Sequence, residues 1–155
     1  MKRTAPIITR SIMIEFFIPG DPVPKGRARH ARVGAGVRTY TPAKTAKYEA
    51  AVKTAARAAM AGAEAISSPV RLSLVIRLAA PSSWSKKRRA EAYGRMIAPT
   101  KKPDASNVVK SVEDGMNGVV YRDDSQIVQL VVSKVYSPWP GVAVRVFPLR
   151  AAPAP

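Results

Sequence analysis

The chain has 155 residues and a formal net charge of +16, with 26 Lys and Arg residues against 10 Asp and Glu. This length predicts one domain with a hydrophobic core large enough to fold unaided, and the absence of cysteine excludes disulfides, thiolate catalysis and zinc fingers. The charge predicts a polyanionic partner, above all nucleic acid, and no apolar run is long enough to span a bilayer.

The folded domain is expected over residues 11–148, between a flexible N-terminus over 1–10 and a disordered tail over 149–155. The first strand is predicted at 11–18, because apolar residues alternate onto one face. These residues are Ile12, Ile14, Phe16 and Ile18.

A basic segment follows, from Asp21 to Pro42, and most of it has neither helical nor strand periodicity. We expect a flexible loop or ribbon, with residues 37–40 as the second arm of a hairpin. Arginine offers a planar fork of donors that suits backbone phosphates. The predicted DNA-binding residues here are Lys25, Arg27, Arg29 and Arg32. The single histidine, His30, is expected to be a solvated loop residue rather than a catalytic base.

A helix is predicted from Thr41-Pro42 to about Ala61, with Thr41 as its N-cap and Pro42 at its first position. Its buried stripe is expected to comprise Tyr48, Val52, Ala55 and Ala59. The clearest strand covers residues 70–79, where one face carries Leu72, Leu74, Ile76 and Leu78.

A second helix is predicted at about 86–93, after a break that ends at Ser85. It carries four consecutive basic residues, and two more precede the next helix. Such a run is usually a solvated face, but its position beside an acidic segment also suggests phosphate contacts. The candidates are Lys86, Lys87, Arg88, Arg89, Lys101 and Lys102.

The third helix is predicted over residues 104–117. On a helical wheel its valines and Met116 face one way, and a polar stripe faces the other. That stripe comprises Asp104, Asn107, Lys110, Ser111 and Asp114. Strands are expected at 126–136 and 142–147 after a turn at 122–125. The order of elements predicts an α+β single domain, a mixed sheet covered by helices.

Five of the ten acidic residues lie between Lys101 and Ile127. Neighbouring carboxylates repel unless a cation neutralises them, so Asp123 and Asp124 together with Asp104 suggest a site for Mg²⁺ or Mn²⁺. Lys110, on the same helical face, could neutralise a scissile phosphate. The alternative is that Asp123-Asp124-Ser125 is only a turn and that Asp104 only caps a helix.

The segment KPDASNVVKSVEDGMNGVVYRDDSQI resembles the signature of RusA-type Holliday junction resolvases, which phages and prophages typically encode. The family pattern is Asp-x-Asp-Asn, a Lys three residues on, an Asp four further, and then Asp-Asp-x-Gln at the start of a strand. PVPKGRARHAR and VRTYTPAKTAKYE also resemble members of this family. The likeness covers most of residues 12–147.

The resemblance implies a homodimeric, Mg²⁺-dependent endonuclease that nicks four-way DNA junctions symmetrically in recombination and repair, in the cytoplasm of a bacterial host. It makes Asp104 and Asp124 metal ligands, with Asp123 joining or supporting them, and Lys110 the catalytic lysine. Asn107 and Asp114 would orient the ligands through hydrogen bonds.

The chain departs from the family pattern at Ser106, where the family has its second Asp. A hydroxyl is a poor substitute for a carboxylate at Mg²⁺, so Ser106 would hold a bound water, or activity is weakened or lost. The rival interpretation is a non-catalytic basic DNA-binding protein whose acidic cluster is structural.

Overall fold

The computed structural model describes residues 12–150. Its central feature is a four-stranded mixed sheet with the order β1-β6-β4-β5, in which β4 and β5 are parallel and the other neighbours are antiparallel. The strands are β1 (Ile14–Pro19), β4 (Val70–Leu78), β5 (Ile127–Tyr136) and β6 (Gly141–Pro148). The predicted mixture of helices and strands in one domain is confirmed; the expected terminal segments lie almost wholly outside the described residues.

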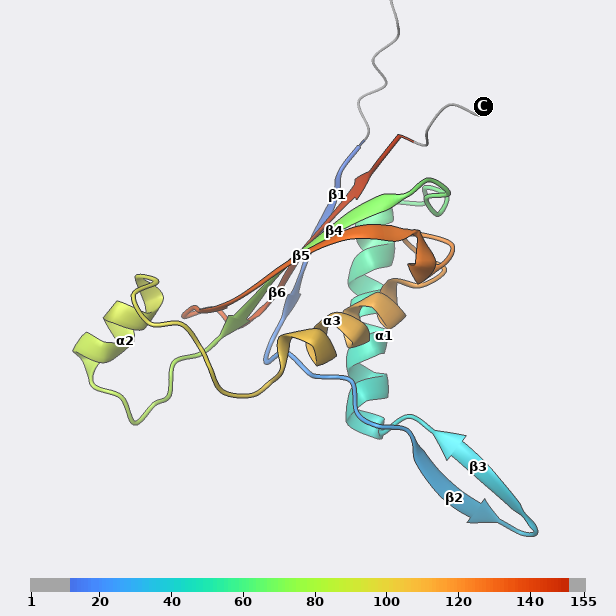
Figure 1. Cartoon of the computed structure of the whole chain (residues 1–155), viewed down its shortest axis with the longest axis horizontal. Helices are drawn as coiled ribbons and strands as arrows, with labels where there is room; N and C mark the ends of the chain where they lie inside the picture. The colour runs from blue at the N-terminus through green and yellow to red at the C-terminus, as the bar shows by residue number, and fades with distance from the viewer. Residues whose placement is uncertain (1–11, 151–155) are drawn as a thin grey trace, which may run out of the picture.

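Two helices, α1 (Ala43–Met60) and α3 (Ala105–Met116), pack on one face of the sheet (Figure 1). The third, α2 (Lys86–Tyr93), lies at the far end of β4 and β5 and contributes Ala92 to a small second cluster with Ala80 and Tyr136. Within the described residues, no helix is both long and apolar enough to cross a membrane.

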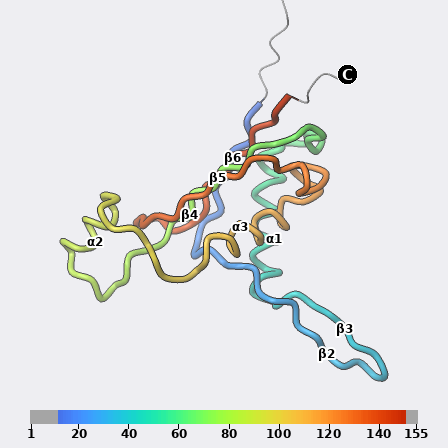
Figure 2. Tube along the Cα trace, viewed as in Figure 1, coloured from blue at the N-terminus to red at the C-terminus, as the bar shows by residue number. Residues whose placement is uncertain are grey.

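A separate hairpin, β2 (Arg29–Val33) and β3 (Gly36–Tyr40), extends away from this body beyond the start of α1 (Figure 2). The predicted ribbon and its second arm are therefore confirmed.

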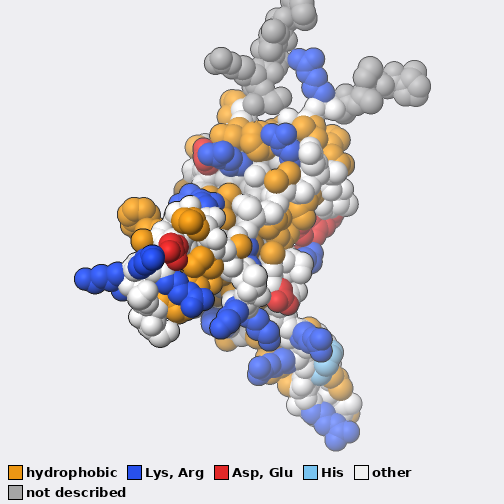
Figure 3. Space-filling view, turned by 60° about the vertical axis from the view of Figure 1, so that its left-hand side comes forward, with side chains coloured by type: hydrophobic (Ala, Val, Ile, Leu, Met, Phe, Trp, Pro, Cys, Tyr) orange, Lys and Arg blue, Asp and Glu red, His pale blue; other side chains and the backbone are white. Residues whose placement is uncertain are grey.

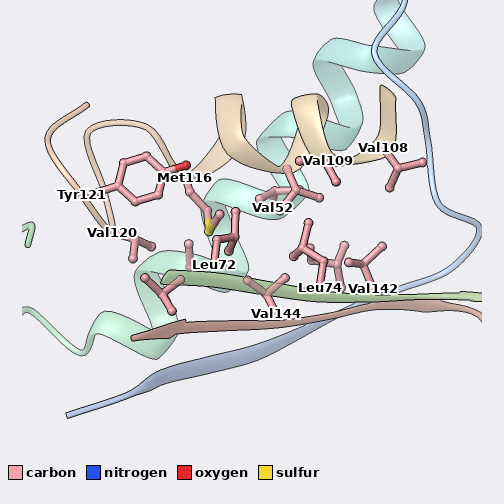
Figure 4. Close-up of a cluster of buried hydrophobic side chains, with 14 of the residues drawn as sticks. Val52, Leu72, Leu74, Val108, Val109, Met116, Val120, Tyr121, Val142 and Val144 are labelled. Atoms are coloured by element: carbon pink, nitrogen blue, oxygen red, sulfur yellow. The ribbon is translucent and has the colours of Figure 1, made fainter. Parts of the chain in front are cut away.

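The core forms where the alternating apolar residues of the strands meet the helices. Leu72 and Leu74 of β4 are fully buried, and α3 presents its predicted valines to them (Figure 4). The sequence predicted these buried faces, because burial of one face imposes an apolar repeat of two residues in a strand and of 3.6 residues in a helix.

Several local predictions were wrong. Ile12 precedes β1 and is 76% exposed, so it does not share the buried face of Ile18. The N-cap of α1 is Pro42 and not Thr41, and the helix makes no side-chain cap hydrogen bond. The buried stripe of α1 keeps Tyr48 and Val52, but its other members differ from those predicted. They are Thr45, Ala56 and Met60.

Helices α1 and α3 cross at Gly115, and this close approach fixes the position of the α3 polar face. A Cβ atom on Gly115 would lie 2.6 Å from Val52 Cβ and 3.0 Å from the Glu49 carbonyl oxygen. Both neighbours belong to the α1 backbone or are attached directly to it, so neither can move aside.

We predict that Gly115→Ala lowers the free energy of unfolding. Helix propensity alone would favour alanine by up to about 1 kcal/mol, but the overlap with α1 costs about 1–3 kcal/mol and outweighs it. Urea unfolding measures the change. Gly36→Ala is the matched control, because the nearest atom to its added Cβ is 3.7 Å away. Equal stability of the Gly115→Ala protein and wild type would contradict the crossing.

Candidate metal and nucleic-acid site

The acidic segment folds so that α3 and the short 3₁₀ turn η1 (Asp124–Gln126) face each other across Lys110. The Lys110 ammonium donates to Asp124 Oδ2 at 2.9 Å and lies 3.0 Å from Asp114 Oδ1, one helical turn further along α3. Hydrogen bonds with Asp124 and Asp114 raise the pKa of Lys110 above its ordinary value. With these two carboxylates in contact, Lys110 carries a positive charge at neutral pH.

Asp114 is shared by two lysines. Its other oxygen, Oδ2, lies 2.8 Å from the ammonium of Lys25, which also pairs with Glu49 of α1. Burial raises the pKa of the Asp114 carboxyl, but the hydrogen bonds from Lys25 and Lys110 outweigh it and hold that pKa below its usual range. The predicted orienting role of Asp114 stays a prediction, and its contact with Lys110 suits that role.

Lys25 thus has a different environment from the one expected. Its ammonium contacts two carboxylates, so its first role is to tie the basic segment to α1 and α3. The Lys25 backbone N–H also donates to the Asn107 carbonyl oxygen at 2.8 Å. The local sequence around Lys25 gives no sign of these partners, because Glu49 and Asp114 lie far away along the chain.

The two aspartates of the Asp-Asp pair differ in environment. Asp123 is the N-cap of η1: its Oδ1 accepts from the Ser125 N–H at 2.8 Å, and the Gln126 side chain accepts from its own N–H in return. Hydrogen bonds from the side chain and from the backbone N–H of Ser125 hold the pKa of Asp123 below its ordinary value. Asp123 therefore has a structural task as a turn residue, whereas Asp124 contacts Lys110.

Asp104 occupies the N-cap position of α3, but its carboxylate accepts no hydrogen bond from that helix's described N–H groups. Among residues 12–150, the one hydrogen bond that this carboxylate accepts is long, 3.4 Å, from Asn107 Nδ2. The carboxylate is exposed, as are the side chains of Ser106 and Asn107. Because the Asp104 carboxylate does not cap the helix, it remains available to bind another partner.

Ser111 was predicted on the polar stripe, and that prediction was wrong. Its side chain is fully buried, and the hydroxyl contacts the carbonyl oxygens of Val23, at 2.6 Å, and Val108, at 3.0 Å. A small hydroxyl at this position lets the basic segment lie against α3. The polar stripe is consequently narrower than the wheel implied.

The available oxygen donors limit what metal site this chain can form. Within residues 12–150, no three Asp, Glu, His or Cys side chains lie close enough to hold a metal ion. Mg²⁺ is commonly bound through one or two carboxylates while keeping several waters. By chemical type, the carboxylates of Asp104 and Asp124 and the hydroxyl of Ser106 are oxygen donors of the kind that such a largely hydrated ion takes.

The basic residues form the surroundings of this site. Figure 3 shows Lys and Arg side chains along the lower part of one face and over the projecting hairpin, with few acidic side chains between them. On α2, Arg88 stacks over the Trp84 ring, with its guanidinium carbon 4.2 Å from the ring centroid. Of the remaining predicted DNA-binding residues, Arg89 is half-buried and the others are exposed, namely Arg27, Arg29, Arg32, Lys86, Lys87, Lys101 and Lys102.

Comparison with known proteins gives two matches. The family described as "Endodeoxyribonuclease RusA" matches residues 19–147. A Bacillus subtilis (strain 168) protein named "Uncharacterized protein YqaN" is 36% identical over 135 residues, which cover 86% of this chain and 94% of that protein. Both matches include the α3 and η1 residues described above.

We predict that Lys25→Met lowers the free energy of unfolding by about 1–2 kcal/mol, between the values typical of exposed and buried pairs. Glu49 and Asp114 would lose their shared cation. A carboxyl with a depressed pKa stabilises the fold above its unfolded pKa, and this contribution disappears as the pH falls through the folded pKa. The loss should therefore be largest at neutral pH and smaller in acid.

Urea unfolding at several pH values measures this effect. Arg27→Met is the matched control, because Arg27 is exposed and forms none of these ion pairs. A loss for Lys25→Met that does not diminish at low pH would contradict the assigned pairing.

Proposed function

Because the chain belongs to the RusA endodeoxyribonuclease family of Holliday junction resolvases, we propose that it is a Mg²⁺-dependent endonuclease. It nicks four-way DNA junctions during recombination and repair, in the cytoplasm of a bacterium or of a phage-infected bacterium. The observation that best supports this proposal is the 2.9 Å contact of Lys110 with Asp124, made by the helix that begins at the uncapped Asp104.

In this proposal Asp104 and Asp124 hold the metal, Asp123 joins or supports them, and Ser106 holds a water bound to the metal. Bound Mg²⁺ would activate water and offset the charge that develops on the phosphate. The protein's own residues position the DNA. Lys110, which is protonated, offers its ammonium to the scissile phosphate, and Asp114 keeps that ammonium in place. Asn107 orients Asp104 through its side-chain amide.

The exposed arginines and lysines would hold the DNA backbone around this site. Phosphate contacts give affinity without sequence preference, which suits an enzyme that selects a branched shape. The basic run of α2 would bind a second part of the substrate, because α2 lies beyond one end of the sheet whereas the hairpin lies beyond the start of α1, apart from α2 (Figure 1).

A non-catalytic DNA-binding role is the second candidate, and one observation favours it. Ser106 lies one helical turn before Lys110, where the family pattern has a carboxylate, so the chain has fewer metal ligands than that pattern provides. The two candidates share the DNA surface and differ in the role of Asp124.

We predict that Asp124→Asn abolishes Mg²⁺-dependent nicking of a four-way junction and leaves junction affinity within about twofold, because it removes a metal ligand and no DNA contact. Ser106→Asp should increase nicking by about tenfold or more, through an added hard ligand. Both are measured on a labelled synthetic junction with Mg²⁺ and with chelator.

Glu15→Gln and Thr54→Asp are the matched controls, since they make the same charge changes at exposed positions on β1 and α1, away from the site. If the Asp124→Asn protein still nicks the junction and Ser106→Asp does not change the nicking rate, the non-catalytic role would be the better description.

We further propose a homodimer formed through β5. This strand is ten residues long and lies at the edge of the sheet, and among the described residues its outer edge pairs with no other strand. Its first charged residue is Lys134, and three apolar residues on it are exposed. They are Val128, Leu130 and Val131, with 64%, 47% and 49% exposure.

Edge strands that are long and apolar tend to pair with another chain, and a symmetric pair of β5 strands makes a self-complementary contact. Because β5 begins directly after η1, such pairing would place two sites on either side of one two-fold axis. A junction that is cut on two strands needs that arrangement.

We predict that the double substitution Val128→Lys and Leu130→Lys halves the mass measured by light scattering, because like charges would face each other across the two-fold axis. Met96→Lys, at a residue that is 79% exposed on the loop after α2, should leave the mass unchanged. A dimer that persists in the double variant would place the interface elsewhere.

A further inference from the structure

The β2–β3 hairpin has no packed face. Every residue of its two strands is exposed except Ala31, which is half-buried. An isolated two-stranded hairpin is marginally stable in water, and hairpins gain stability when a third element covers one face. The hairpin extends from the body (Figures 1 and 2), so its partner must come from outside the described chain.

The charge on the hairpin identifies that partner as a polyanion. There is no acidic residue between Asp21 and Glu49, and arginines lie on both faces of the ribbon. Opposite residues of an antiparallel pair share a face, so the Ala31–Arg38 pair marks one face and the Arg32–Val37 pair marks the other. A ribbon lying flat on one surface would use only one of these faces, whereas this ribbon can contact phosphates on two sides.

The tip of the hairpin is uncharged and apolar. Val33 and Val37 are 61% and 69% exposed, and only Gly34, Ala35 and Gly36 lie between them. A continuous duplex stacks its base pairs and presents only their edges in its grooves. At a branch point stacking is interrupted, and base-pair faces become available to the apolar side chains that proteins use as wedges.

We propose that the β2–β3 hairpin inserts into the centre of branched DNA. Arg32 and Arg38 contact phosphates of two different arms, and Val33 and Val37 pack against the base pairs at the branch point. This inference rests on the proposed function and adds to it the element that distinguishes a junction from a linear duplex.

The root of the hairpin is fixed to the candidate site. The Gly26 N–H donates to Thr45 Oγ1 of α1 at 3.1 Å, and the Lys25 N–H donates to the Asn107 carbonyl oxygen of α3 at 2.8 Å. Insertion of the tip therefore sets the distance between the branch point and the phosphate that reaches Asp124.

The alternative binding site for the hairpin is the major groove of a single duplex, which is about 12 Å wide and also admits a two-stranded ribbon.

The test compares binding of the full-length protein to a four-way junction and to a linear duplex with the same arm sequences, with chelator present so that nothing is cut. We expect Val33→Ser/Val37→Ser to weaken junction binding about tenfold and to leave duplex binding unchanged. A 2-aminopurine placed at the branch point should brighten with wild type and not with this variant. Met96→Ser is the control for loss of an exposed apolar side chain.

The arginines are tested separately. Arg32→Gln and Arg38→Gln should each lower junction affinity and reduce the salt dependence of junction binding by about one phosphate contact. Arg57→Gln, at an exposed α1 position, should change neither.

Equal losses on junction and duplex would place the hairpin in a duplex groove and overturn the inference. Unchanged junction binding in the tip variant would overturn it as well, while a wild-type preference for the junction would leave the proposed function standing. A wild-type protein that binds both DNAs equally would overturn the proposed function itself.

Discussion

A chain of alternating charges holds the candidate site together. It runs from Glu49 on α1 through Lys25 and Asp114 to Lys110 and Asp124. Its members come from two helices, the basic segment and η1, and they are 20–49% exposed. One partly exposed ion pair contributes little, but each inner member of this chain has two partners, so its side chain is restrained from both sides. The sheet supplies stability, and this chain sets where the polar groups lie.

The same contacts separate acids with structural tasks from acids that are available for chemistry. Asp114 is engaged by two lysines and Asp123 by the N–H groups of its own turn. Asp104 occupies the N-cap position of α3 without capping the helix. Among the described residues, Asp124 forms an ion pair with Lys110 alone. Four neighbouring aspartates therefore have four different environments, although their side chains are chemically identical.

Sequence periodicity predicted the strands of the sheet and the buried valines of α3, because burial of one face forces a regular spacing. Periodicity failed where contacts between segments that are distant in the sequence determine which side chains are buried and which partners they have. Ser111 fits the polar stripe by its angle, yet it is buried because the basic segment crosses α3 there. The environment of Lys25 depends on Glu49 and Asp114, and the crossing at Gly115 depends on Val52. For the site, the helical wheel identified Lys110 and Asp114 as neighbours, since they are one turn apart. The contact with Asp124 required the chain to fold back after α3.

Ser106 changes the charge of the site as well as its ligands. Within the chain of ion pairs, three carboxylates and two ammonium groups sum to −1. Asp104, the other proposed metal ligand, brings the sum to −2, and a carboxylate at position 106 would bring it to −3. In the proposed site, a bound Mg²⁺ would therefore leave no net negative charge with serine at position 106, and it would compete with Lys110 for Asp124. A DNA phosphate would then meet no net repulsion, and it would supply the oxygen ligand that the family pattern has at position 106. Under this proposal metal and DNA should bind more tightly together than either does alone, because each lowers the electrostatic cost of the other. Serine at position 106 would then favour metal binding in the DNA complex over metal binding in the free protein, and DNA affinity would be the property that the basic surface and the hairpin determine.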